Sequence, residues 1–175
     1  MAGRIDKRLK ELGITLPAAS TSLGNYVGHV RAGNLVFSVQ APLVDGKPRY
    51  QGRVGAEYTL EEGQACARLV AINLLGQLHQ ACDGDLDRVR RCIRLGGFIA
   101  VAAGFDKHSQ VMNGASDLMV AVFGEKGRHT RFALGLVSLP IDMTVNIEGV
   151  FEIAPARARA KRAAASRPRR TARRR

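Results

Sequence analysis

Two charged side chains stand in apolar surroundings in the C-terminal half of the sequence. Arg131 begins the run RFALGL (131–136), and Glu148 lies inside VNIEGV (145–150). An arginine at the start of an apolar strand needs an anionic partner or a cleft that holds water. Two interpretations stay open. Either Arg131 and Glu148 are salt-bridged or lie at solvated strand ends, or Arg131 binds a substrate carboxylate with two N–H groups while Glu148 handles a water molecule.

Familiar catalytic motifs are absent from the sequence, which contains no GxSxG, HExxH, Walker loop or GxGxxG. Aromatic residues make up only 5% and tryptophan is absent, which argues against a base-stacking platform for nucleic acid. The histidines have no partner at metal-ligand spacing, and we expect surface or turn positions for His29, His79, His108 and His129. No CxxC pair is present, and we expect small core residues at Cys66, Cys82 and Cys92.

The elements that must position these residues follow from the hydrophobic pattern. Thr59 and Glu62 form a capping box, and the apolar residues after it repeat every 3.6 residues, which predicts a helix over 60–81. The remaining patterns predict a short helix over 4–13, a helix over 107–124, and strands over 25–31, 34–40, 89–101, 129–138 and 144–153. The main order β-β-α-β-α-β-β predicts an α+β fold in which both long helices cover one face of a single sheet.

The second face of that sheet is predicted to be apolar as well. In the strand over 129–138, Phe132, Leu134 and Leu136 alternate with residues that are also small or apolar. Two helices can cover only one face, so the other must pack against something else. Oligomerisation is the simplest cover for it.

Charge is concentrated at the C-terminus. The formal net charge is +12 over 175 residues, but ten of the 27 basic residues and none of the 15 acidic residues lie in 155–175. The remaining 17 basic residues leave 1–154 at +2. We therefore divide the chain into an N-terminal helix and loop (1–19), a folded domain (20–154) and a disordered basic tail (155–175). The first residues contain no apolar signal segment and no apolar run reaches 18 residues, so we expect a cytoplasmic protein without membrane contact.

Several segments together resemble one known family. Residues 130–148, TRFALGLVSLPIDMTVNIE, resemble the signature of the Rid family of reactive intermediate deaminases, also called YjgF: an Arg-led strand, Leu-Pro, and a strand that ends in Glu. Upstream, GNYV (24–27) resembles the family's Gly-Pro-Tyr segment, and GNLVFSVQ (33–40) resembles its Gly-Asn-X-X-X-Ser-Gly-Gln strand. MNGA (112–115) stands where the family has an Asn at the start of its second helix. The matches are collinear over about 20–154.

The resemblance implies a chorismate-mutase-like α+β fold with a mixed sheet, and a homotrimer with three sites in the clefts between subunits. It also implies hydrolysis of enamines and imines, such as 2-imino acids, to 2-oxo acids and ammonia, with no metal or cofactor. Arg131 would then hold the substrate carboxylate, and Glu148 would position the attacking water and accept its proton. Tyr26 and Asn113 would line the cleft, and the backbone at Val39 would polarise the substrate.

Two departures from the family pattern bear on activity and substrate range. Val39 stands where the family commonly has Gly, and Ala133 stands where deaminating members often have Cys, two residues after the Arg. Two alternative functions therefore stay open. One is a non-catalytic Rid-like protein that binds a small carboxylate. The other is an endoribonuclease-like protein, or one that binds nucleic acid non-specifically through its basic tail.

Overall fold

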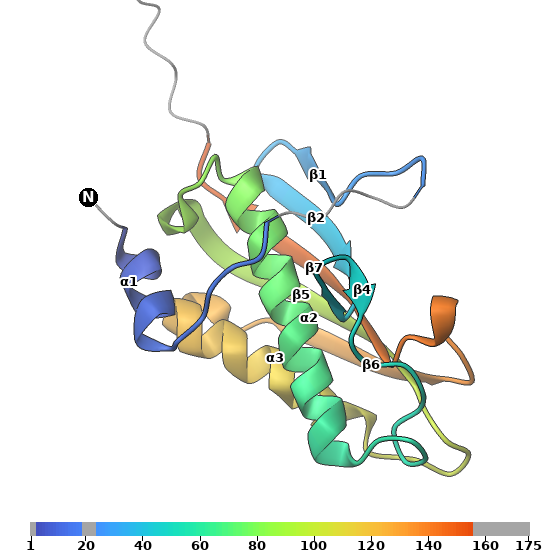
Figure 1. Ribbon diagram of the computed structural model, residues 1–175. Helices are drawn as coiled ribbons and strands as arrows, with labels where there is room; N and C mark the ends of the chain where they lie inside the picture. Colours follow the sequence, from blue (N-terminus) through green and yellow to red (C-terminus); the bar gives the residue numbers. More distant parts are fainter. Residues whose placement is uncertain (1–2, 19–23, 156–175) are drawn as a thin grey trace, which may run out of the picture.

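A five-stranded mixed sheet forms the centre of the protein, with strand order β1-β2-β7-β5-β6. The structure, a computed structural model, describes residues 3–18 and 24–155 (Figure 1). Neighbouring strands are antiparallel except β5 and β6, which are parallel. The strands are β1 (His29–Ala32), β2 (Leu35–Gln40), β5 (Val89–Ala100), β6 (Thr130–Leu136) and β7 (Val145–Ile153). This confirms the predicted α+β fold with a mixed sheet.

Two long helices, α2 (Leu60–Ala81) and α3 (His108–Phe123), lie side by side across one face of the sheet (Figure 1). Helix α2 begins and ends where the sequence predicts. Thr59 Oγ1 accepts a hydrogen bond from the Glu62 amide at 3.2 Å, and the Glu62 carboxylate accepts one from the Thr59 amide at 2.8 Å. Helix α3 connects β5 to β6, and this crossover is what allows the two strands to run parallel.

The two faces of the sheet differ in composition. Side chains alternate between faces along a strand, and residues paired across strands share a face. On the face under α2 and α3, Val36, Leu95 and Phe151 are fully buried. On the other face, which we call the open face, large apolar side chains are 37–57% exposed: Val30, Phe37, Val39, Leu134 and Leu136. Among the described residues, an apolar face thus remains without a helix over it, as the sequence predicts.

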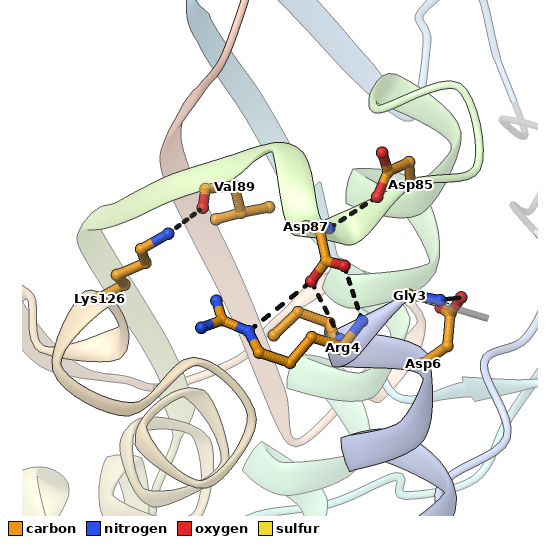
Figure 2. A network of polar contacts seen from close by, with 8 residues as sticks. Gly3, Arg4, Asp6, Asp85, Asp87, Val89 and Lys126 are labelled. Carbon is orange, nitrogen blue, oxygen red and sulfur yellow. Dashed lines mark hydrogen bonds and ion pairs between the residues drawn. The ribbon is translucent and has the colours of Figure 1, made fainter. Parts of the chain in front are cut away.

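The N-terminal helix α1 (Arg4–Glu11) packs beside α3 and the short 3-10 helix η1 (Leu86–Arg88). Its first amides are capped from far away in the sequence. The carboxylate of Asp87 accepts hydrogen bonds from the backbone N–H groups of Arg4 at 2.7 Å and Ile5 at 3.1 Å (Figure 2). The Arg4 guanidinium lies 4.0 Å from the same carboxylate. Asp87 therefore connects α1 to η1, which directly precedes β5.

Shorter elements complete the described chain. Strands β3 (Leu43–Val44) and β4 (Lys47–Pro48) form a small separate hairpin, and 3-10 helices η2 (Gly124–Gly127) and η3 (Pro140–Asp142) flank β6.

No helix in the described ranges 3–18 and 24–155 is long and apolar enough to cross a membrane. The basic tail lies, apart from Pro155, outside the described residues, so its predicted disorder stays a prediction.

Candidate functional site

Arg131 lies on the edge strand β6 and points toward helix α3. It pairs in register with Leu95, which is buried under the helices, so its side chain shares that covered face. The guanidinium Nη1 donates to Asn113 Oδ1 at 3.0 Å and to Ser116 Oγ at 3.0 Å. The structure therefore brings together two residues that the sequence analysis singled out, Arg131 and Asn113. Arg131 remains exposed to solvent, so its charge is available to a ligand.

His129 extends this group of polar side chains. Its Nδ1 lies 2.6 Å from the Gly127 carbonyl oxygen, and its Nε2 lies 3.0 Å from Ser116 Oγ. Burial lowers the pKa of His129, and the nearby Arg131 charge lowers it further, whereas the hydrogen bond to Gly127 opposes this effect. The half-buried ring lies in the connection between η2 and β6, as expected for a turn histidine, and it has hydrogen-bond partners at both nitrogens. We call Asn113, Ser116, His129 and Arg131 the Arg131 cluster.

Glu148 occupies the opposite face of the sheet. It pairs in register with Val39 on β2 and Gly96 on β5, and both of its carboxylate oxygens lie 3.2 Å from Arg94 Nη2. The Glu148 side chain is 27% exposed and that of Arg94 46%. Glu148 is thus salt-bridged, as one interpretation of the sequence allows, but its partner is Arg94 rather than Arg131.

A hollow of about 460 Å³ opens beside Glu148 on the open face. Tyr26 and Val39, both singled out from the sequence, contribute to its wall together with Glu148. The side-chain oxygen of Asn146 is buried at the same wall and has no hydrogen-bond partner among the described residues. Most of the remaining lining is apolar, including Val27, Val30, Phe37, Leu43 and Ile141. We call this feature the open-face hollow.

The segment that carries Tyr26 is held in place by two polar residues of β2. Ser38 Oγ donates to the Gly28 carbonyl at 2.7 Å, and Gln40 Nε2 lies 3.4 Å from the same oxygen. Both side chains are buried. They anchor the backbone next to Tyr26, which itself is 65% exposed. Ser38 and Gln40 also line the hollow, so they both hold the segment that carries Tyr26 and contribute to the wall.

The two departures from the family pattern lie on different faces. Val39 is 57% exposed in the open-face hollow, and β2 keeps an unbroken register with β7 on either side of it. Ala133 pairs with Gly97, lies on the covered face and packs against the core. A branched side chain at position 39 therefore occupies volume in the hollow, whereas Ala133 belongs to the side of Arg131.

Arg131 and Glu148 do not meet within one chain. They lie on strands separated by β5, about 10 Å apart in the plane of the sheet, and their side chains leave opposite faces. The described residues therefore present two partial sites. The Arg131 cluster offers a guanidinium for an anion, and the open-face hollow offers a carboxylate, an amide and apolar walls.

Sequence reasoning missed Ser116, His129, Arg94 and Asn146. Ser116 is one helical turn after Asn113, and His129 is one strand repeat before Arg131, so the spacings Asn-x-x-Ser and His-x-Arg were the available signals. Asn146 shares the strand alternation of Glu148. Arg94 gives no such signal, because only the register of β5 with β7 brings it to Glu148.

Comparison with known proteins agrees with this architecture. Protein TCP17 of Trypanosoma cruzi is 43% identical over 154 residues, which cover 87% of this chain and 96% of TCP17. The crystal structure of Atu1372 from Agrobacterium tumefaciens, a protein of unknown function, is 43% identical, with a TM-score of 0.79 over 85% of this chain and 92% of that one. A "putative endoribonuclease" of Shewanella oneidensis is 36% identical, with a TM-score of 0.82 over 85% of this chain and 99% of that one.

More distant structures share the fold alone. RidA from a Psychrobacter species is 24% identical, with a TM-score of 0.51 over 77% of this chain and 94% of that one. Residues 6–151 match the family described as "YjgF/chorismate mutase-like, putative endoribonuclease". The resemblance seen in the sequence is therefore confirmed, and the chain belongs to the Rid/YjgF family.

Proposed function

We propose that the protein hydrolyses 2-imino acids, or the enamines in equilibrium with them, to 2-oxo acids and ammonia. The observation that carries the proposal is the state of Arg131. Its Nη1 is occupied by Asn113 and Ser116, whereas Nε and Nη2 have no hydrogen-bond partner among the described residues. The Nε–Nη2 edge is one that binds a carboxylate with two parallel hydrogen bonds. A 2-imino acid carries such a carboxylate next to its reactive carbon.

Glu148 supplies the base in this proposal. Water attacks the carbon of the protonated imine, and Glu148 takes the proton that the water releases, which forms a neutral carbinolamine. Glu148 then returns this proton to the nitrogen. As the C–N bond breaks and ammonia leaves, the carbinolamine hydroxyl gives its proton to Glu148 and becomes the carbonyl of the 2-oxo acid, and the ammonia carries that proton away as ammonium. Arg94 holds Glu148 in one orientation for the transfer. The reaction adds one water and releases one ammonia, so atoms and charge balance without an oxidant.

The site in this proposal is made between copies of the chain, arranged as a ring of three. Arg131 lies on edge strand β6, and the open-face hollow lies around β1, β2 and β7 toward the other edge. A head-to-tail ring brings the β6 edge of one copy next to the hollow of the following copy, so the two partial sites combine at each junction. The same ring would bury the exposed apolar side chains of the open face.

The experiment measures 2-oxo acid formation from 2-imino acids generated in situ by an amino-acid oxidase. The full chain should accelerate hydrolysis, and Arg131→Ala should lower kcat/KM by about 100-fold or more, because a charged partner of the substrate is removed. Arg128→Ala is the matched control, since Arg128 lies three residues earlier, is exposed and pairs only with Glu125 among the described residues. The proposal fails if the wild-type protein accelerates none of the small, branched and aromatic 2-imino acids.

One alternative shares the same partial sites. If the protein binds 2-oxo acids without accelerating hydrolysis, and Arg131→Ala abolishes that binding, a non-catalytic carboxylate-binding function replaces the hydrolase. Isothermal titration with pyruvate and with a branched 2-oxo acid separates the two cases.

The words "putative endoribonuclease" in the description of the family and of the Shewanella protein favour a second candidate, which is action on RNA. Residues 1–154 carry a net charge of only +2, so we assign any RNA affinity to the basic tail. RNA binding and cleavage by the full chain and by a chain lacking 155–175 test this. RNA affinity that survives the deletion would contradict the assignment to the tail, and cleavage would favour the nuclease.

A further inference from the structure

A continuous series of hydrogen bonds ends at the guanidinium of Arg131. It begins at the carbonyl of Gly127, passes through both nitrogens of His129, and reaches Arg131 through Ser116 Oγ. We propose that His129 is a positioning residue which, through Ser116, fixes the guanidinium of Arg131 so that its Nε–Nη2 edge faces a carboxylate. This inference rests on the proposed function for the identity of the ligand. It deepens that function by naming the residue that orients the guanidinium of Arg131.

The direction of each hydrogen bond follows from the first one. A carbonyl oxygen can only accept, so the Gly127 carbonyl requires the proton of His129 to be on Nδ1. In the neutral ring Nε2 is then an acceptor, and Ser116 must donate its hydroxyl proton to it. This leaves the lone pairs of Ser116 Oγ to receive an N–H of Arg131 Nη1. Each group therefore has one role.

The starting point of the series is closely packed. Gly127 is buried, and a Cβ at this position would collide with the backbone oxygen of Met119 in α3. Its carbonyl is consequently fixed against the same helix that carries Asn113 and Ser116. The neutral state of the ring is also favoured, because burial and the Arg131 charge both lower the pKa of His129.

At the other end of the series, two side chains accept hydrogen bonds from the guanidinium of Arg131. Asn113 and Ser116 lie three residues apart on α3 and present their oxygens on one side of the helix. Together they take both N–H groups of Nη1, which sets the plane of the guanidinium. Without Ser116, or with Ser116 hydrogen-bonded elsewhere, only one of these two contacts would remain. The guanidinium plane would then turn more freely about the Cδ–Nε bond.

The test is a double-mutant cycle in the full chain. Ser116→Ala and His129→Phe are each expected to raise the Kd for pyruvate about 10-fold, because each removes one link to a charged group. The double variant should bind no more weakly than either single variant, since the two residues act in one series. His129→Gln should restore affinity to within about 2-fold of wild type, because a carboxamide also offers one donor and one acceptor. Independent, additive losses would overturn the proposal.

A second measurement does not depend on the ligand. Relaxation of the ¹⁵Nε–H group of Arg131 reports the order of its guanidinium directly. We expect high order in wild type and His129→Gln, and low order in Ser116→Ala and His129→Phe. His79→Phe is the control, because His79 lies at the end of α2, away from the cluster. Unchanged order in all variants would overturn the proposal. The proposed function fails if no 2-imino acid is hydrolysed faster, whereas the order of Arg131 decides the role of His129 independently of any ligand.

Discussion

The covered and open faces belong to the same strands, but among the described residues only the covered face has helices packed over it. On the covered face, Leu95 and Phe151 are fully buried, and the charged end of Arg131 has polar partners on α3. On the open face, Val39 and Leu134 are half exposed, and an Asn146 oxygen is buried without a partner among the described residues. The comparison teaches that the chain supplies its own partners for Arg131, whereas the surroundings of Glu148 stay open in the single chain.

The largest expected effect concerns assembly through the open face. Leu134 is 50% exposed there, and Leu134→Glu should convert a proposed trimer to single chains, because three carboxylates would be desolvated at the junctions. Val120→Glu is the matched control, since Val120 is 37% exposed but lies on helix α3. Sedimentation velocity measures both. A wild-type protein that sediments as an 18.9 kDa monomer would contradict the proposed trimer itself.

The next prediction contrasts two phenylalanines on opposite faces of the sheet. Phe151→Ala removes a fully buried ring and should lower the free energy of unfolding by about 3–5 kcal/mol at every protein concentration. Phe37 is 38% exposed in the single chain, so Phe37→Ala should cost less in dilute protein. If a second copy covers the open face, the cost of Phe37→Ala should grow with protein concentration. Chemical denaturation over a 100-fold concentration range distinguishes the cases, and equal losses for both variants in dilute protein would break the comparison.

The sequence predicts elements better than it predicts the two faces. The sequence predicts both ends of helix α2 well, because its capping box and its 3.6-residue repeat are both local signals. The strand predicted over 129–138 is found at Thr130–Leu136, and the one over 25–31 begins only at His29. Strand ends depend on partners elsewhere in the chain, so local patterns place them less well.

The site could be predicted only in part. The charged residues in apolar strands and the resemblance to the family directed attention to Arg131 and Glu148. Residues 132–137 are small or apolar at every position, so their alternation does not show which face Arg131 takes. The Arg94–Glu148 pair joins residues 54 positions apart and follows from strand register alone. His129 and Ser116 likewise meet only because α3 lies against the start of β6.

A smaller effect is expected where α1 extends the covered side. Asp87→Ala removes the carboxylate that caps Arg4 and Ile5, and should lower the free energy of unfolding by about 1–2 kcal/mol. Asp117→Ala, at an exposed position of α3, should leave it unchanged. Limited proteolysis should also cut α1 faster in the Asp87 variant. Equal stability and equal cleavage of the two variants would show that the long-range cap does not hold α1.

The smallest expected effect concerns the three cysteines. In the folded protein they should react hardly at all with a thiol reagent. Burial raises the pKa of Cys66 and Cys92 to about 12 and that of Cys82 to about 11. Because the thiolate is the reactive form, a thiol reagent at pH 8 should label the folded protein only at the rate of unfolding. Fast labelling of any one cysteine in the folded state would place it outside the closed core.

The same thiols make stability depend on alkaline pH. An unfolded thiol ionises near its ordinary pKa of about 9, whereas the folded thiols remain protonated up to pH 11–12. Their contribution to stability is therefore complete below pH 9 and is lost as the pH rises toward 12. Denaturation curves at pH 8 and pH 10.5 should show this decline, and Cys66→Ala should reduce it. A decline of the same size in the variant would assign it to other groups.

The cap on α1 also sets an order of folding events. An eight-residue helix is too short to be stable by itself, because ordering its first turn costs more free energy in conformational entropy than the first hydrogen bonds return. Its capping carboxylate belongs to Asp87, 83 residues beyond Arg4. During synthesis, α1 therefore lacks this cap until the chain has been extended past Asp87. We expect α1 to become ordered only after that point, together with the elements against which it packs.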